Sequence, residues 1–142
     1  MKEIVLDTET TGISVKEGHR IVEIGCIELD NLIPTENKFH CYLNPERKVS
    51  EKAFKVHGYS DEFLSKQKKF NEISEQFLNF IQNKKLIIHN AEFDLSHLNN
   101  DFEMNKRTNS NISYFKKIIK PTTDEINKHE KYLRQNLKKN FY

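Results

Sequence analysis

The sequence is poor in apolar residues and cysteines, and it carries almost no excess charge. Of its 142 residues 36% are hydrophobic, whereas a typical globular domain has about 45%. The length suits one domain around one hydrophobic core, and the low apolar content leads us to expect a marginal core. The formal net charge of +2 permits a nucleic-acid partner without indicating one.

The two cysteines, Cys26 and Cys41, have no CxxC spacing and no cluster of cysteine and histidine around them. We therefore expect reduced thiols in a cytoplasmic protein, and neither a disulfide nor a zinc site. No apolar run approaches the roughly 18 residues that a membrane-spanning helix needs, and no signal-peptide pattern opens the chain. We expect a soluble protein that is not exported and has no membrane partner.

Apolar patterning over residues 1–104 predicts an α/β fold, a mixed sheet flanked by helices. β-type runs are expected as strands at residues 3–6, 20–30, 38–43 and 86–90. The first three follow one another, the third after a break at Pro34, and this succession predicts an antiparallel meander. Helical spacing predicts a short helix around Ala53, Phe54 and His57, a longer one carrying Phe63, Phe70, Ile73, Phe77, Phe80 and Ile81 on a buried face, and a last one at residues 93–104.

The composition changes after Met104, where the stretch NKRTNSN contains no apolar residue. We place a domain boundary there, with a main domain at residues 1–104 and a polar junction and basic C-terminal tail at residues 105–142. The tail is expected to be extended up to Pro121 and helical after a cap at Thr123. Its basic residues predict either a solvated face or a surface that follows a phosphate backbone.

The stretch VLDTETTG, residues 5–12, places Asp7 and Glu9 directly after apolar residues. Residues i and i+2 of a strand point to the same face, so the two carboxylates are expected side by side at the end of the first strand. Adjacent carboxylates repel each other, and a divalent cation that prefers oxygen ligands, Mg²⁺ or Mn²⁺, would relieve the repulsion. The alternative is a polar strand end whose acidic residues face water.

A second polar segment, HNAEFDLSHL, follows the fourth expected strand and places Asp94 at the start of the next helix. A third carboxylate from another strand end is what a two-metal phosphoryl-transfer site requires, with the metal ions about 4 Å apart. One ion would activate a water molecule, and the other would stabilise the leaving oxygen.

Four segments in this order, VLDTETTG, RIVEIGCIEL, AFKVHGYSDEFL and LIIHNAEFDLSHLN, resemble the proofreading 3′→5′ exonuclease (epsilon) subunits of bacterial DNA polymerase III. These belong to the DEDD exonuclease superfamily, which has a ribonuclease H-like fold. The resemblance covers residues 3–104. It implies metal-dependent hydrolysis of 3′-terminal nucleotides in replication proofreading, with two Mg²⁺ or Mn²⁺ ions per site. It also implies two partners, a single-stranded DNA 3′ end and the polymerase catalytic subunit.

The resemblance assigns residues to the site. Its catalytic and metal-binding residues would be Asp7, Glu9 and Asp94. Its substrate-binding residues would be Asp7, Thr8, Glu9, Thr10, His57, Asn90 and Phe93. For His57 the alternative is a hydrogen-bonded core histidine.

The sequence departs from the family pattern at two places. The family has an acidic residue just before the Ala-Phe of the third segment, facing the terminal nucleotide, whereas this chain has Lys52. The family's last motif supplies a histidine, the general base, and an aspartate five positions later. After Asp94 the chain has His97 and His129, and Asp101 and Asp124, and no pair of these has that spacing.

The second departure predicts an internal deletion, so that the domain would lack a fifth strand and the closing helices, and the fourth strand would form a sheet edge. Three hypotheses follow. In the first, the chain is an exonuclease whose base comes from His129 or a partner chain. In the second, it is a catalytically inactive module that binds nucleic acid or polymerase. In the third, it is an inactive remnant.

Overall fold

Three long strands form an antiparallel meander at the start of the chain. The structure is a computed structural model that describes residues 1–104. The three strands are β1 (Lys2–Thr10), β2 (Ile21–Asp30) and β3 (Ile33–Tyr42). β2 lies in the middle of the three and is buried along nearly its whole length. This confirms the predicted meander.

A short fourth strand, β4 (Lys85–Ile87), makes the sheet mixed, because it pairs with β1 in parallel. The strand order is β3-β2-β1-β4, so β4 forms one edge of the sheet that the described residues build. The observed β4 is thus shorter than the strand predicted at residues 86–90 and begins one residue earlier. The predicted lack of a fifth strand and closing helices concerns the part of the chain after residue 104. Residues 105–142 lie outside the described residues.

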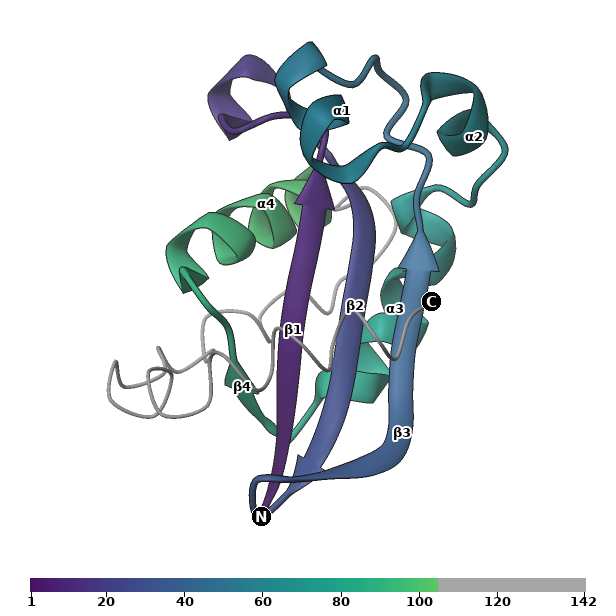
Figure 1. Cartoon of the computed structure of the whole chain (residues 1–142). Helices are drawn as coiled ribbons and strands as arrows, with labels where there is room; N and C mark the ends of the chain where they lie inside the picture. Colours follow the sequence, from purple (N-terminus) through teal and green to yellow (C-terminus); the bar gives the residue numbers. More distant parts are fainter. Residues whose placement is uncertain (105–142) are drawn as a thin grey trace.

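Helices cover one face of the sheet and the end at which β1 stops (Figure 1). Two longer helices pack on that face, and three shorter ones lie near the ends of β1 and β3. The helices are η1 (Val15–Glu17, 3-10), α1 (Glu51–His57), α2 (Asp61–Ser65), α3 (Phe70–Ile81) and α4 (Ala91–Met104). No helix in residues 1–104 has the length and apolar content needed to span a membrane.

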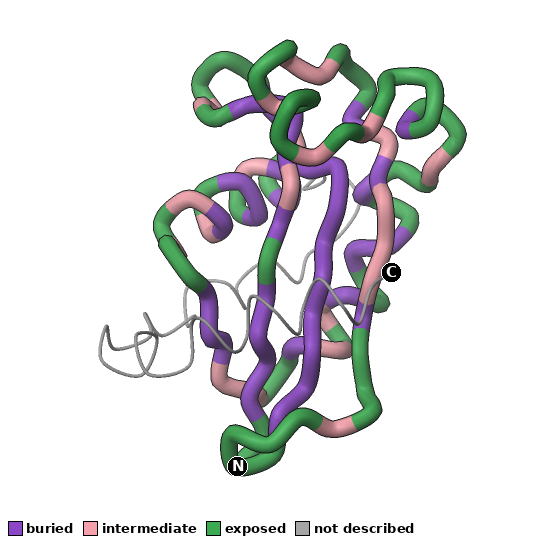
Figure 2. Tube along the Cα trace, viewed as in Figure 1, coloured by how far each residue is buried: buried purple, intermediate pink, exposed green. Residues whose placement is uncertain are grey.

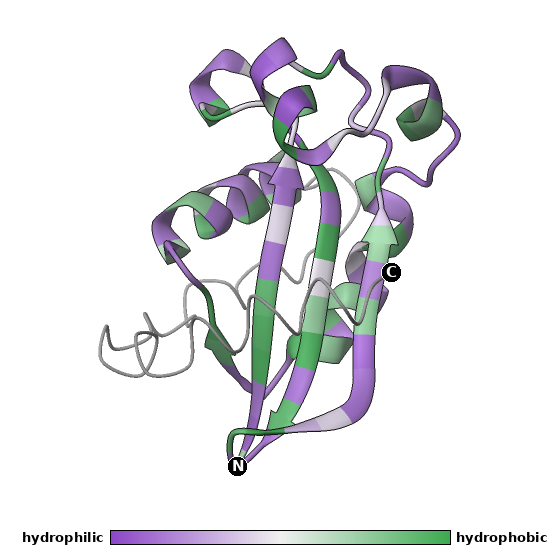
Figure 3. Cartoon of the chain, viewed as in Figure 1, coloured by the Kyte–Doolittle hydropathy of each residue, from purple (hydrophilic) through white to green (hydrophobic). Residues whose placement is uncertain are grey.

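The main core lies between the sheet and the two longer helices. Alternate β1 residues, Ile4 and Leu6, meet Phe77 of α3 and Leu98 and Phe102 of α4. Figure 2 shows the continuous buried stretches on β1 and β2. In Figure 3 β1 changes from hydrophobic to hydrophilic along its length, so that its polar half emerges where the core ends.

Two predicted features are wrong in detail. Pro34 does not break a strand, because it lies within β3 opposite Leu29, and an edge strand tolerates a residue without an N–H group. Phe63 does not lie on the buried face of the long helix. It belongs to α2 and is 37% exposed, its ring against Tyr42, because the chain leaves helical geometry before α3 begins at Phe70.

Candidate functional site

The polar half of β1 begins where its neighbour β4 stops. β4 pairs with β1 only from Glu3 to Val5, so the backbone N–H of Thr8 has no strand partner on that side in the described residues. Asp94, in the first turn of α4, takes this place. Its Oδ1 accepts a hydrogen bond from Thr8 N at 3.1 Å and one from the Thr8 hydroxyl at 2.5 Å. One carboxylate therefore fixes α4 to the end of β1.

Asp7 and Glu9 lie on the other side of β1 from the Thr8 side chain. Asp7 is exposed and Glu9 is half-buried, and the strand alternation between them is regular up to Thr10, where the pairing with β2 shifts. The expectation that both carboxylates share one face agrees with this register. Asp94 approaches from the helix-covered face, so the three carboxylates reach the end of β1 from two sides.

The Asp94 carboxyl is 3% exposed. Burial raises its pKa to about 7, the hydrogen bonds from Thr8 oppose the shift, and the negative charge of Asp7 adds to it. Near neutral pH this carboxyl is therefore only partly ionised.

The chemical type of these donors suits a divalent cation, but their positions do not yet form a metal site. Carboxylate oxygens are the ligands that Mg²⁺ and Mn²⁺ prefer. A cation would offset the burial that chiefly raises the pKa of Asp94 and the smaller repulsion from Asp7. As the side chains lie, however, residues 1–104 contain no group of three or more His, Cys, Asp or Glu residues placed to hold a metal ion. Asp7, Glu9 and Asp94 as metal ligands stay a prediction.

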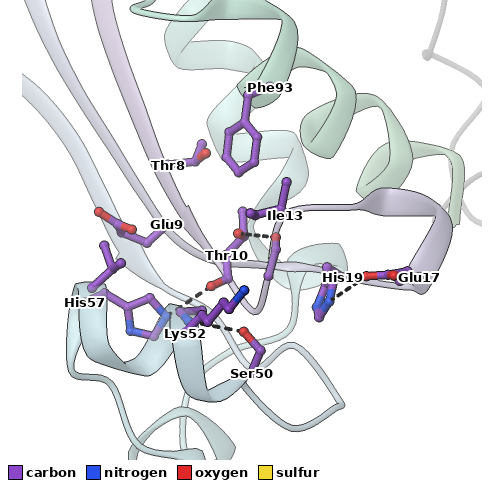
Figure 4. Close-up of a pocket in the computed structure, with 13 residues that line it drawn as sticks. Thr8, Glu9, Thr10, Ile13, Glu17, His19, Ser50, Lys52, His57 and Phe93 are labelled. Carbon is purple, nitrogen blue, oxygen red and sulfur yellow. Dashed lines mark hydrogen bonds and ion pairs between the residues drawn. The ribbon is translucent and has the colours of Figure 1, made fainter.

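A cavity of about 390 Å³ opens beside this strand end (Figure 4). Its lining comes from β1, from the loop that follows, from α1 and from Phe93 of α4. Five of the predicted substrate-binding residues line it, namely Thr8, Glu9, Thr10, His57 and Phe93. Asp7 and Asn90 are not in its lining. Asn90 is exposed with a φ of 52°, and its carbonyl accepts a hydrogen bond from Phe93 N, so it begins the turn into α4.

His57 is held in one tautomer by two backbone groups. Its Nδ1 accepts a hydrogen bond from Tyr59 N at 3.0 Å, so its Nε2 carries the proton and donates to Thr10 O at 3.0 Å. Burial lowers the pKa of His57, which favours this neutral form. His57 is thus fully hydrogen-bonded, as one alternative expected, but it is half-buried and does not lie in the core. It lines the cavity, and its role in substrate binding stays a prediction.

His19 is a residue of the site that sequence reasoning missed. It is buried, and its Nδ1 lies 2.9 Å from the Thr11 hydroxyl. That hydroxyl also accepts from Arg20 N, so it joins His19 to the start of β2. The ring covers Gly12, where an added Cβ would come within 2.5 Å of all three nearest ring atoms. The Thr-Thr-Gly ending of the first segment was the available signal, because glycine there permits this close contact.

α4 holds the loop after β1 at two further points. His97 Nε2 lies 2.9 Å from Ile13 O, and Asp101 accepts bonds from Arg20 Nε at 2.6 Å and Ile21 N at 3.3 Å. Asp94, His97 and Asp101 thus form a buried polar row, spaced three and four residues apart, along the inner side of the helix. Burial raises the pKa of Asp101, and Arg20 opposes that shift.

The comparison with known families gives one match that spans most of the chain. A family model described as "Exonuclease" matches residues 4–141. The match extends beyond residue 104, and the domain boundary proposed there stays a prediction.

Curated relatives are similar over a large share of this chain. The DNA polymerase III subunit epsilon of Rickettsia typhi is 51% identical over 108 residues, which are 76% of this chain and 47% of that protein. The Escherichia coli (strain K12) subunit is 43% identical over 121 residues, 82% of this chain and 50% of that protein. The chain thus spans about half the length of the curated relatives it matches.

Solved structures show the same fold at low sequence identity. The exonuclease I from Methylocaldum szegediense superposes with a TM-score of 0.67 at 16% identity, over 73% of this chain and 24% of that one. A metal-free complex of Escherichia coli exonuclease I with single-stranded DNA gives a TM-score of 0.66 at 15% identity, over the same shares. These neighbours and the mixed sheet confirm the expected ribonuclease H-like fold.

Proposed function

Because this chain belongs to the exonuclease family, we propose that it is a metal-dependent 3′→5′ exonuclease of the DNA polymerase III epsilon type. It would hydrolyse the 3′-terminal nucleotides of single-stranded DNA during replication proofreading. The activity, the DNA substrate and the polymerase catalytic subunit as partner all belong to the proposal. A role at replicating DNA would place the protein in the cytoplasm, as its two free thiols lead us to expect.

One observation carries this proposal. The end of β1, with Asp7 and Glu9, adjoins a cavity of about 390 Å³ and is joined to Asp94 through Thr8. The cavity volume lies in the range of about 300–1,000 Å³ that small-molecule sites occupy. A strand end could enter there, beside the carboxylates, with the ring of Phe93 on one wall and His57 on another.

Asp7, Glu9 and Asp94 are the residues that would hold a divalent ion. When bound, such an ion supplies Lewis-acid activation of water and of the phosphoryl oxygens. The protein's own residues would position the strand end. His57, with both ring nitrogens bonded to backbone, keeps Thr10 and α1 at a fixed separation and does not act as a base.

A catalytically inactive binding module is the second candidate, and one sequence observation favours it. Among the residues given after Asp94, no histidine is followed five positions later by an aspartate. If no other residue or chain supplies the base, its loss would cost about 10²–10⁴ in rate, so slow release and no release are both compatible with an intact binding cavity. His129 lies outside the described residues, and its role as a substitute base stays a hypothesis.

The test is release of the 3′-terminal nucleotide from a short 5′-labelled single-stranded DNA, with Mg²⁺ or Mn²⁺ and with long incubation. We expect slow release by the purified chain and none by the Asp7→Asn variant. Asp30→Asn is the matched control, because Asp30 is an exposed carboxylate at the opposite end of the strands and its loss should leave release unchanged.

The outcomes separate the two candidates. Release that persists unchanged in Asp7→Asn would reject the site. If neither protein releases nucleotide, binding of the same DNA is measured by fluorescence anisotropy. Binding without release would favour the inactive module, and absence of both would reject the proposal.

A further inference from the structure

We propose that Lys52 makes this cavity selective for DNA strands that end in a 3′-phosphate over strands that end in a 3′-hydroxyl. The inference rests on the proposed function, because it assumes that a strand end enters the cavity. It goes beyond that function by naming the chemical class of end that is preferred.

The position of Lys52 is set by the start of α1. Ser50 caps this helix by accepting a hydrogen bond from Ala53 N at 3.1 Å, and Ser50 N in turn donates to Thr11 O at 2.8 Å. The first turn of α1 is therefore fixed to the loop that follows β1. This places Lys52 in the cavity wall, beside Thr10 and His57 (Figure 4).

The rest of the lining makes Lys52 the important charge. Among the lining residues that the structure describes, Lys52 is the only lysine or arginine. The two histidines carry little charge at neutral pH, because burial lowers the pKa of both His19 and His57. Two carboxylates, Glu9 and Glu17, also line the cavity, and Glu17 lies beside His19. The positive charge of the cavity is therefore concentrated at one place, on α1.

The apolar side chains lie elsewhere in the lining. Ile13, Val56 and Phe93 present hydrocarbon surface to the cavity, which suits the base and sugar of a terminal nucleotide. Suppose that these groups receive the base and sugar, and that the scissile phosphate faces the carboxylates. The group at the 3′ position of the sugar then points to the wall formed by α1. Lys52 belongs to that wall.

The charge of Lys52 distinguishes the two kinds of strand end. A 3′-hydroxyl is neutral, whereas a phosphate monoester carries about −1.5 to −2 at pH 7 and three acceptor oxygens. Two unit charges 4 Å apart attract by about 1 kcal/mol in water and by more near a protein surface. An acidic residue would instead repel the phosphate. We therefore expect the phosphate end to bind about fivefold more tightly, the factor that corresponds to about 1 kcal/mol.

Hydrolysis of such an end would give a distinctive product. Water would add to the terminal phosphodiester phosphorus, and the bond from phosphorus to the 3′ oxygen of the preceding nucleotide would break. The shortened strand would keep a 3′-hydroxyl after taking up a proton, and the released nucleotide would be a nucleoside 3′,5′-bisphosphate. A 3′-hydroxyl end would release a nucleoside 5′-monophosphate, so mass spectrometry distinguishes the two.

The test measures binding by fluorescence anisotropy, in EDTA so that no strand is hydrolysed. Two 5′-labelled single strands of identical sequence are compared, one ending in a 3′-phosphate and the other in a 3′-hydroxyl. The proteins are the full chain, Lys52→Glu and, as matched control, Lys55→Glu. Lys55 is exposed on the same helix, pairs with Glu51, and does not line the cavity. Circular dichroism establishes that all three proteins are equally folded.

We expect about a fivefold preference for the 3′-phosphate in the full chain and in Lys55→Glu, and loss or reversal of this preference in Lys52→Glu. Equal binding of both strands by the full chain, or a preference unchanged in Lys52→Glu, would overturn the inference alone. Failure to bind either strand, together with no nucleotide release in Mn²⁺, would overturn the proposed function and this inference with it.

Discussion

Backbone groups help to hold the individual residues of the site in place. His57 bonds to Thr10 O and Tyr59 N, and Asp94 accepts from Thr8 N. Backbone partners cannot change rotamer, so these contacts fix ring and carboxylate orientations more strictly than contacts between flexible side chains. A preorganised wall of this kind suits the binding of a strand end.

Gly12 provides a test of this close packing. We expect Gly12→Ala to lower the free energy of unfolding by about 1–3 kcal/mol, the usual cost of overpacking, because its Cβ would lie 2.3 Å from His19 Cε1. Urea unfolding measures the change.

The double variant Gly12→Ala/His19→Ala controls for the cause. If the ring of His19 is what the methyl group meets, the second substitution should recover part of the loss. A double variant in which the two losses simply add would show that the contact is not responsible.

Among the elements, α4 connects the most distant parts of the site. Its inner polar row reaches Thr8 in β1, Ile13 in the loop, and Arg20 and Ile21 at the start of β2. The helix thereby holds both ends of the loop that carries Gly12 and His19. A change in α4 should move the cavity wall without removing any residue that lines it.

Asp101→Asn tests this role of the helix. Asp101 is 1% exposed and pairs with Arg20, whose side chain is 11% exposed. Removing one partner of a buried pair typically costs about 3–5 kcal/mol, because the other charge stays buried without compensation. We expect a loss at the lower end of that range, since the amide can still accept one hydrogen bond.

Thermal and urea unfolding measure this loss. Glu92→Gln is the matched control, because Glu92 is an exposed carboxylate on the same helix. The two variants should differ clearly in stability. Similar small losses in both would mean that the Asp101–Arg20 pair contributes little to holding α4 on the sheet.

For the whole molecule, an ionic cluster joins the strands at the end of the sheet away from the site. Glu28 of β2 is 3% exposed and accepts bonds from Lys2, Lys84, Thr35 and Asn37, at 2.8–3.1 Å. These donors come from β1, from β3 and from the residue before β4. One carboxylate of β2 therefore contacts β1, β3 and the residue that precedes β4.

The cluster predicts a dependence of stability on pH. Hydrogen bonds from Lys84, Lys2 and Asn37 lower the pKa of Glu28 from 4.5 to about 2. A depressed pKa means that the folded state favours the ionised carboxylate. Its contribution to stability is complete above about pH 4.5 and is lost as the pH falls towards 2.

Thermal melting of the full chain and of Glu28→Gln, at several pH values from 7 to 2.5, checks this. The variant should be less stable at pH 7, and the difference should shrink below pH 4.5. A difference that stays constant over this range would show that the ionisation of Glu28 does not stabilise the fold.

The sequence predicted the class and order of the elements well, and their limits less well. The strands, the meander and the helix at residues 93–104 follow from local alternation and helical spacing, which hydrophobic burial imposes on neighbouring residues. Pro34 and Phe63 were wrongly interpreted for a physical reason. Whether a proline interrupts a strand depends on whether its nitrogen faces a neighbouring strand or the open edge of the sheet. Whether a phenylalanine is buried depends on which helix carries it.

The sequence by itself determined that the two carboxylates of the first strand lie on one face. Asp7 and Glu9 share a face because side chains of a strand alternate, a local property that needs no knowledge of the rest of the chain. Only the tertiary structure decided that Asp94 replaces β4 as the partner of Thr8, that His19 covers Gly12, and that Lys52 enters the cavity wall. The bond from Thr8 to Asp94 joins residues 86 positions apart, and a contact of that separation depends on how the helices pack on the sheet, which local patterns do not specify.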